Sequence, residues 1–530
     1  MKRTNILWIV ALALGWLFDF LFWKHAQGVN FAIFAGLCLG GGFLVLVLNG
    51  IKPSLRSLLL LIPILFFATI TVIRQEPMSV FLAFAFTLAL MGMLAFTYLG
   101  GRWLWYSLSD YVVNSVRLIG SMIARPLMFL NESRKPVPAE GTQARSGWKR
   151  FWAIFRGVLI AIPIVAIFAA LLSSADLVFA QRLQDFVKLF RLENLPEYIF
   201  RCIYILIGAY ALAGTILHAA QKSQDDKLVG TDKPLVPSFL GFTEAAVVLG
   251  AVVVLFALFA VVQFQYFFGG QTNIGVQGYT YAEYARRGFS ELVAVAFFSL
   301  LLFLSLGAVV KRQNQTQRLV FSGLGLGMVA LVGVMLISAF QRLILYEAAY
   351  GFSRLRAYTH VFMIWLGVLL VVVVVLDILR KERAFALAAL LASLGFAVNL
   401  SLINVDGFIV RQNVSRAAAG EDLDVAYLAS LSSDSVPPLV ESLLDGRLTP
   451  GTRDMVGAAL VCRVNADLNR DPDTNWRSFT LSRRWADQSL ERAQVREILD
   501  NYGILDDNWP VQVQTPLGTQ FDCYNSGSMD

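Results

Sequence analysis

The sequence predicts an all-α fold: a polytopic bundle of about eleven membrane-spanning helices, followed by a small, mainly helical soluble domain. Hydrophobic residues make up 57% of the chain and charged residues only 15%, against the roughly 25% that is usual in soluble proteins. The charges also divide unevenly along the chain. Residues 1–404 carry 33 basic and 18 acidic side chains, whereas residues 405–530 carry 11 and 19. We therefore expect a helical transmembrane domain over 1–404 and an acidic domain over 405–530.

The membrane domain is predicted from apolar runs of about 16 or more residues, each long enough to cross most of a hydrocarbon core about 30 Å thick. Each run is predicted to be a helix, because backbone polar groups in lipid must be hydrogen-bonded within the segment. The runs lie at 6–23, 31–48, 58–73, 80–99, 157–175, 198–219, 239–264, 292–310, 319–340, 361–379 and 385–403.

Between the fourth and fifth runs, the stretch Trp103–Leu130 mixes aromatic and aliphatic residues with Asp110, Arg117 and Arg125. This pattern predicts an amphipathic helix that lies on the membrane surface. The proline- and glycine-containing stretch that follows, up to about residue 150, is predicted to be a cytoplasmic loop.

The basic residues of the short loops indicate the orientation. If the N-terminus is cytoplasmic, the inner segments carry 22 Lys and Arg residues and the outer segments carry 11. Cytoplasmic loops hold the excess of basic residues in membrane proteins, so we expect the N-terminus inside. An odd number of spans then places residues 405–530 outside the cytoplasm.

The domain over 405–530 is predicted to be mainly helical, because apolar residues recur at helical spacing from Leu423 to Leu444 and from Trp485 to Leu499. The stretch after Asn508 is short and turn-rich. Cys462 and Cys523 are the only cysteines here. Outside the cytoplasm they are candidates for a disulfide. The sequence does not fix the distance between them, so the pairing stays open.

Several kinds of chemistry are disfavoured. The three histidines, His25, His218 and His360, have no metal-ligand spacing, and no C-x-x-C pair is present, so we expect no metal and no cofactor. The basic residues flank apolar runs and form no patch with interleaved aromatics, so we expect no nucleic-acid partner. The Gly-x-Gly-x-Gly segment at 323–327 lies inside an apolar run, where small residues allow helices to approach closely.

Polar residues gather near the outer ends of the seventh to eleventh runs, with one carboxylate near the inner end of the seventh. Three consecutive outer segments share tyrosines, arginines and carboxylates, which is more than anchoring at the interface requires. The candidate residues are Glu244, Gln263, Tyr281, Glu283, Arg286, Arg287, Arg342, Glu347, Arg354, Arg356 and Asp406. Charges near membrane depth are costly unless paired, so we expect Glu283 or Glu347 to pair with nearby arginines. Such a cluster could bind a ligand, or it could hold the helices to the following domain.

Several of these segments also resemble a bacterial family of multi-pass membrane proteins that is catalogued only as a domain of unknown function. The matching segments are GFTE at 241–244, VQFQYFFGG at 262–270, YAEYARRGF at 281–289, RLILYEAAYG at 342–351, NVDGFIVRQN at 404–413 and LDVAYL at 423–428. The resemblance covers about residues 239–445. It implies an inner-membrane protein with a short helical segment after the last span, and it implies no activity or catalytic residue.

Three classes of function stay open. The favoured class is a non-enzymatic sensing, regulatory or scaffolding protein of the envelope, with an envelope protein partner bound through residues 405–530. A transporter or permease is the first alternative, because Glu244 and Gln263 lie near or within spans. A membrane enzyme acting on envelope or lipid-linked substrates is the second, with Glu283, Glu347 and Asp406 as acids or bases. We expect that the protein is not an enzyme, because no recognisable nucleophile–base pair is present.

Overall fold

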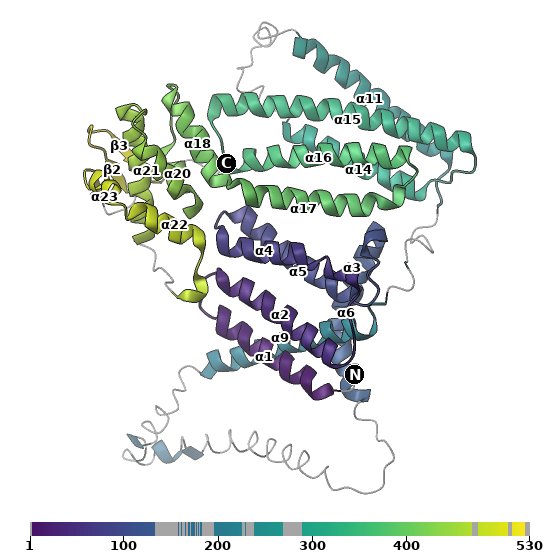
Figure 1. The fold of residues 1–530 in the computed structure, drawn as a ribbon, viewed down its shortest axis with the longest axis horizontal. Coiled ribbons are helices and arrows are strands. Elements are labelled where there is room, and N and C mark those ends of the chain that lie inside the picture. Colours follow the sequence, from purple (N-terminus) through teal and green to yellow (C-terminus); the bar gives the residue numbers. More distant parts are fainter. Residues whose placement is uncertain are drawn as a thin grey trace.

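Figure 1 shows the fold in a computed structural model of the chain. The structure describes residues 3–132, 195–224, 238–268, 289–468, 475–506 and 511–524, together with Leu228 and single positions between 157 and 182. Long helices form a bundle, and the C-terminal part of the chain, from Val405 onward, covers one end of that bundle (Figure 1). We call this C-terminal part the tail.

Within the described ranges, ten helices are long and apolar enough to cross a membrane. They are α1 (Thr4–Phe22), α2 (Val29–Leu48), the segment of α3 (Leu55–Leu58) and α4 (Leu61–Ile73), α5 (Pro77–Thr97), α9 (Leu195–Gln221), α11 (Phe242–Phe268), α14 (Phe289–Val309), α15 (Gln315–Tyr350), α16 (Arg354–Ile378) and α17 (Phe385–Ile403). The predicted all-α polytopic fold is therefore confirmed. The predicted span at 157–175 lies largely outside the described residues, so the expected count of eleven stays a prediction.

The helices pack in two groups. One core joins α1, α2, α4, α5 and α9 through residues such as Leu7, Phe67 and Leu217. The other joins α11, α14, α15 and α16 through residues such as Leu249 and Met328. Helix α17 lies between the two groups and packs against both α5 and α16 (Figure 1).

A short 3₁₀ turn and a helix lie at the end of the bundle where α1 begins. The 3₁₀ turn is η1 (Trp103–Trp105), and the Trp103 indole donates to the Arg56 carbonyl at 3.0 Å. Helix α6 (Leu108–Glu132) follows, packs against α9, and leaves Val112, Val116 and Ile123 exposed. The helix that the sequence predicts at 103–130 therefore forms with an uncovered apolar face. Its position at a membrane surface stays a prediction, and the loop predicted after it lies outside the described residues.

The tail is a compact unit of short helices with one small sheet. Its elements are α18 (Val405–Ala418), α19 (Val425–Ala429), η4 (Ser433–Ser435), α20 (Val436–Leu444), α21 (Pro450–Leu468), η5 (Trp476–Ser478), α22 (Leu481–Leu490), α23 (Ala493–Leu499), β1 (Gly503–Asp506), β2 (Gln512–Gln514) and β3 (Gln520–Asp522). The strands are antiparallel in the order β1-β2-β3, with Val513 opposite both Ile504 and Phe521. The sheet was not predicted, because strands of three or four residues are too short to show an alternating pattern.

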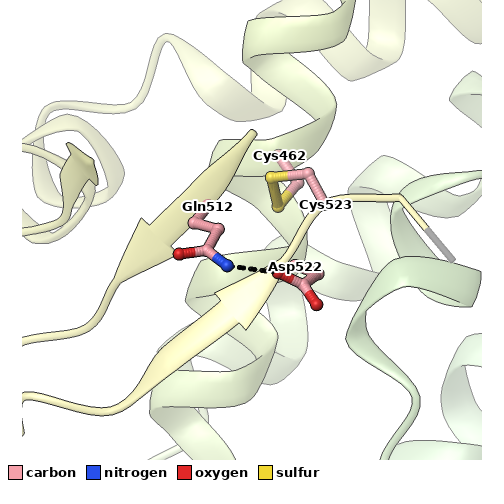
Figure 2. Close-up of a disulfide and its surroundings, with 4 residues drawn as sticks. All are labelled: Cys462, Gln512, Asp522 and Cys523. Atoms are coloured by element: carbon pink, nitrogen blue, oxygen red, sulfur yellow. Dashed lines mark hydrogen bonds between the residues drawn. A yellow bond between two sulfur atoms is a disulfide. The ribbon is translucent and has the colours of Figure 1, made fainter. Parts of the chain in front are cut away.

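A disulfide holds the sheet against the helices (Figure 2). Cys462 in α21 and Cys523 after β3 are bonded at an S–S distance of 2.00 Å, which is the pairing that the sequence left open. Next to it, the Gln512 side-chain amide donates to the Asp522 carboxylate at 2.8 Å (Figure 2). The link joins the last described strand to the longest helix of the tail.

Hydrogen bonds at the two ends of α2 identify the two ends of the bundle. Helix α2 begins beside the tail, where the Val29 N–H donates to the Phe479 carbonyl at 2.9 Å. It ends at the opposite side, where the Arg3 N–H donates to the Asn49 side chain at 2.9 Å. The start of α1 therefore lies at the end of the bundle away from the tail.

Candidate functional site

The candidate site begins at the turn between the last span and the tail. Helix α17 ends at Ile403 and α18 begins at Val405, with Asn404 between them in the left-handed region at φ 55°. The Asn404 side-chain oxygen accepts a hydrogen bond from the Gly407 N–H at 3.0 Å and so caps α18. Asparagine tolerates this backbone conformation better than most residues and is also a good N-cap. The cap places Asp406 in the first turn of α18, facing the bundle.

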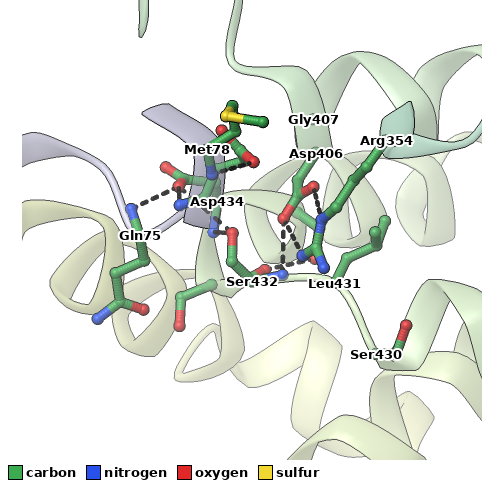
Figure 3. A network of polar contacts seen from close by, with 12 residues as sticks. Gln75, Met78, Arg354, Asp406, Gly407, Ser430, Leu431, Ser432 and Asp434 are labelled. Atoms are coloured by element: carbon green, nitrogen blue, oxygen red, sulfur yellow. Dashed lines mark hydrogen bonds and ion pairs between the residues drawn. The ribbon is translucent and has the colours of Figure 1, made fainter. Parts of the chain in front are cut away.

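Asp406 is fully buried and forms the central ion pair of the site (Figure 3). Arg354, the first residue of α16, donates to its two oxygens from Nε at 2.7 Å and from Nη2 at 2.6 Å. The Ser432 N–H in the tail donates to the same carboxylate at 2.7 Å. A bidentate, charge-assisted pair of this kind is strong and directional, so it fixes α16 against the tail.

Asp434, also from the tail, binds the loop between α4 and α5 (Figure 3). Its carboxylate accepts the Gln75 N–H at 2.7 Å and the Glu76 N–H at 2.9 Å, and Arg74 lies 3.4 Å from it. The Arg74 Nε in turn donates to the Ser401 carbonyl in α17 at 3.0 Å. One aspartate of the tail thus accepts two backbone N–H groups of the loop that joins α4 to α5.

Glu76 is a third buried carboxylate, and it belongs to the bundle. It caps α5 by accepting from the Met78 N–H at 2.9 Å and the Ser79 N–H at 2.7 Å, with Pro77 at the first helical position. The Tyr358 hydroxyl of α16 also donates to Glu76. We call Arg74, Glu76, Arg354, Asp406 and Asp434 the polar junction.

Burial shapes the electrostatics of the tail side of the junction. It raises the pKa of the Asp434 carboxyl, while the Gln75 N–H and the Arg74 charge act in the opposite direction. Ionised Asp434 therefore costs the folded state free energy, and the donors around it limit that cost. Burial likewise raises the pKa of the Tyr427 hydroxyl, which accepts the Arg354 N–H at 2.8 Å and stays neutral near pH 7.

Two further contacts hold the tail to the ends of other spans. The Asn413 side chain accepts the Phe352 N–H at 2.7 Å and donates to the Phe352 carbonyl at 2.9 Å, so it pairs like a strand with the turn between α15 and α16. Gly28, before α2, lies so close to the tail that a Cβ there would be 2.6 Å from the Phe479 carbonyl oxygen. Only glycine fits at this contact.

A cavity of about 340 Å³ lies beneath the tail beside the polar junction. Its polar lining comes from both sides of the contact and includes Arg74, Arg354, Arg463, Ser430, Ser432 and Thr480. Both junction arginines thus keep a face toward this cavity while they bind their carboxylates.

A comparison with protein families identifies the chain. The family described as "Domain of unknown function (DUF4153)" matches residues 61–442. The chain belongs to the DUF4153 family. No curated protein and no solved structure matches it. The family match confirms the resemblance seen in the sequence and extends it toward the N-terminus, so that it includes every residue of the polar junction.

The structure places the candidate residues of this family member in several locations. Arg354 and Asp406 form the central pair described above. Gln263 in α11 is buried, and its side-chain oxygen accepts from the Ser338 hydroxyl at 3.1 Å and from Arg342 Nη2 at 2.8 Å, both in α15. Glu244 lies at the opposite end of α11, where its carboxylate accepts the Gly241 N–H at 2.9 Å and caps the helix.

Among the described residues, Glu347 forms no ion pair with an arginine, so the expected pairing of Glu283 or Glu347 with nearby arginines stays a prediction. Glu347 is buried in α15, and its carboxylate lies 3.1 Å from His360 Nδ1 in α16. Arg356 donates to the Gly351 carbonyl before α16, and its guanidinium lies 4.1 Å from the centre of the Tyr346 ring. Tyr281, Glu283, Arg286 and Arg287 lie outside the described residues, so their roles stay predictions.

Sequence reasoning missed the junction partners Arg74, Glu76 and Asp434. A signal was present for Glu76, because an acidic residue directly before a proline and an apolar run is a typical helix start. No comparable signal was present for the contacts of Asp434. The sequence around it indicates only a helix start, whereas its partners Gln75 and Glu76 are more than 350 residues away in sequence. Within the described ranges, no three His, Cys, Asp or Glu side chains gather as metal ligands.

Proposed function

We propose that this protein is a non-enzymatic membrane protein of the bacterial envelope that senses, regulates or scaffolds through its tail. The observation that carries the proposal is the polar junction, in which tail carboxylates bind groups from the ends of α4, α5 and α16, and Arg74 links the junction to α17 through the Ser401 carbonyl. A tail bound this firmly cannot move without moving the spans. A partner bound to the tail would therefore act on the bundle, or the bundle on the partner.

The proposed orientation has the N-terminus in the cytoplasm of the cell and the tail on the outer side of the inner membrane. Two observations support it. The predicted inner loops carry twice as many basic residues as the outer loops. The tail also contains the Cys462–Cys523 disulfide, and disulfides persist in oxidising compartments such as the periplasm.

The chemistry of the junction favours a structural role over catalysis. The two oxygens of Asp406 are bound by Arg354 and Ser432, and Glu76 is used as a helix cap. Carboxylates in such contacts stabilise packing and are not free to exchange protons with a substrate. For a partner, the tail offers Ile504, Leu505 and Leu517, three exposed apolar residues of its sheet and of the turn that joins β2 to β3.

The test breaks the central pair and follows both structure and phenotype. Asp406→Asn leaves the Arg354 guanidinium without its charged partner, which for a buried pair costs about 3–5 kcal/mol. We expect the variant to insert in the membrane, to expose its tail to protease, and to fail to complement the phenotype of a deletion strain. Asp422→Asn, at an exposed aspartate of the same tail, is the matched control and should behave as the wild type.

The two readouts separate the proposal from its alternatives. If Asp406→Asn loosens the tail but complements fully, coupling through the junction is not the function, and transport by the bundle alone becomes the better explanation. Immunoblots of the membrane fraction provide the necessary check that both variants are present at the same level.

A further inference from the structure

A second cavity lies at the end of the bundle away from the tail. Its volume is about 920 Å³, and it opens between the end of α14, the start of α15 and the end of α16. Pockets that take a ligand of moderate size range from about 300 to 1,000 Å³. Neither the candidate cluster nor the polar junction uses this cavity.

The polar part of the cavity is basic. Among the lining residues that the structure describes, Arg312, Arg318 and Arg380 are basic and Asp377 is acidic. Within the described part of the chain, no polar group contacts the guanidinium of Arg318 or that of Arg380. The Asp377 carboxylate accepts from the Ser322 hydroxyl at 3.2 Å. Among the described lining residues, three arginines therefore face one carboxylate, and the guanidinium groups of Arg318 and Arg380 are available to an anion.

Two of these arginines are held in place by the backbone. Arg312 donates from Nη2 to the Gly307 carbonyl at 2.8 Å, and its guanidinium lies 4.8 Å from the centre of the Phe321 ring. Arg380 follows the C-cap of α16 and has φ 57°. Its N–H donates to the Asp377 carbonyl, and the N–H of Lys381 donates to the Leu376 carbonyl. Glycine usually occupies this position in such a helix end, because a Cβ is unfavourable there. The chain keeps an arginine there, at the rim of the cavity.

The other part of the cavity is apolar and faces the surface that lipid would cover. Leu319 is 61% exposed and Ile378 is 64% exposed, and both line the cavity together with Leu326. Gly323 lies between Leu319 and Leu326 in the sequence of α15, and nothing is within 4 Å of the position that a Cβ would take there. The cavity thus passes from charged groups at the helix ends to an open apolar groove along the span.

We propose that this cavity binds an anionic phospholipid. The guanidinium groups would hold the phosphate, which arginine recognises with paired N–H donors, and an acyl chain would lie over Gly323 and Leu326. Basic pockets between spans are known to select anionic headgroups in this way. The apolar groove favours a lipid over a soluble phosphate, because a free phosphate has no apolar surface to bury there.

The experiment measures lipid retained by the purified full-length protein in detergent, by native mass spectrometry, with phosphatidylglycerol, phosphatidylcholine and soluble glycerol phosphate as separate probes. The wild type should retain phosphatidylglycerol in preference to both other probes. Arg318→Gln with Arg380→Gln should weaken it by about tenfold for each guanidinium removed. Gly323→Leu should weaken it by blocking the groove, at a position where an added Cβ meets nothing within 4 Å.

Each variant has a matched control in the same region. Arg383→Gln removes a positive charge at the same end of the bundle outside the cavity, and Gly333→Leu adds the same side chain to α15 at another open position. Both should retain phosphatidylglycerol as the wild type does. The proposal is overturned if phosphatidylcholine or glycerol phosphate binds equally well, if the cavity variants bind normally, or if the controls lose as much as the cavity variants.

Discussion

At the scale of single residues, three buried carboxylates illustrate what sequence can and cannot indicate. Asp406, Glu76 and Asp434 are 0%, 1% and 3% exposed. The sequence predicted that Asp406 and Arg354 belong to a shared outer cluster, because both lie at the polar ends of apolar runs. The sequence could not predict that Asp406 and Arg354 form a pair. Their pairing depends on the direction that α18 takes after the turn at Asn404, and residue types alone do not determine that direction.

A glycine at the edge of the tail provides a test at the same scale. Gly28→Ala would bring its Cβ to within 2.6 Å of the Phe479 carbonyl oxygen and 2.7 Å of the Ser478 carbonyl carbon. Backbone atoms cannot rotate away, so the tail must shift, at a cost of about 1–3 kcal/mol. We expect faster proteolysis of the tail in membrane vesicles, with the bundle intact.

The control for this substitution lies in the next helix. Gly36→Ala, in α2, adds the same methyl group where nothing lies within 4 Å, and it should leave the rate of proteolysis unchanged. Equal rates for Gly28→Ala and the wild type would show that the tail does not rest on this loop.

At the scale of elements, helix positions were predictable and several helix ends were not. The apolar run at 319–340 marks a span, yet α15 extends from Gln315 to Tyr350. Its 36 residues correspond to about 54 Å at 1.5 Å per residue, well beyond a hydrocarbon core of about 30 Å. An apolar run reports only the part of a helix that faces lipid. Polar turns beyond it are stabilised by tertiary contacts, such as the bond from Arg416 to the Ala348 carbonyl at 2.9 Å.

The disulfide of the tail makes a prediction about α21 and the sheet. Cys462 and Cys523 are 61 residues apart, and a cross-link that closes a loop of this length stabilises a fold by about 2–4 kcal/mol. Replacing both by serine should lower the unfolding temperature of the tail, and dithiothreitol should lower that of the wild type by the same amount. The measurement is protease resistance of the tail against temperature, in purified full-length protein. A reductant effect in the double-serine variant would contradict this account.

At the scale of the whole molecule, the spans explain why the sequence was informative. Long helices cross the bundle from end to end, so α1 begins at one end and α17 delivers the chain to the tail at the other. Hydropathy predicts such an order, because lipid leaves few alternatives to helices. Side-by-side packing was not predictable: α17 joins two groups of helices through contacts between segments far apart in sequence.

The most direct test of this account asks on which side of the membrane the tail lies. Alkaline phosphatase, which is active only outside the cytoplasm, and green fluorescent protein, which fluoresces when it folds inside, are fused in turn after Asp530. The account predicts phosphatase activity without fluorescence. Fluorescence without phosphatase activity would contradict it, because the tail, its disulfide and the polar junction would then face the cytoplasm.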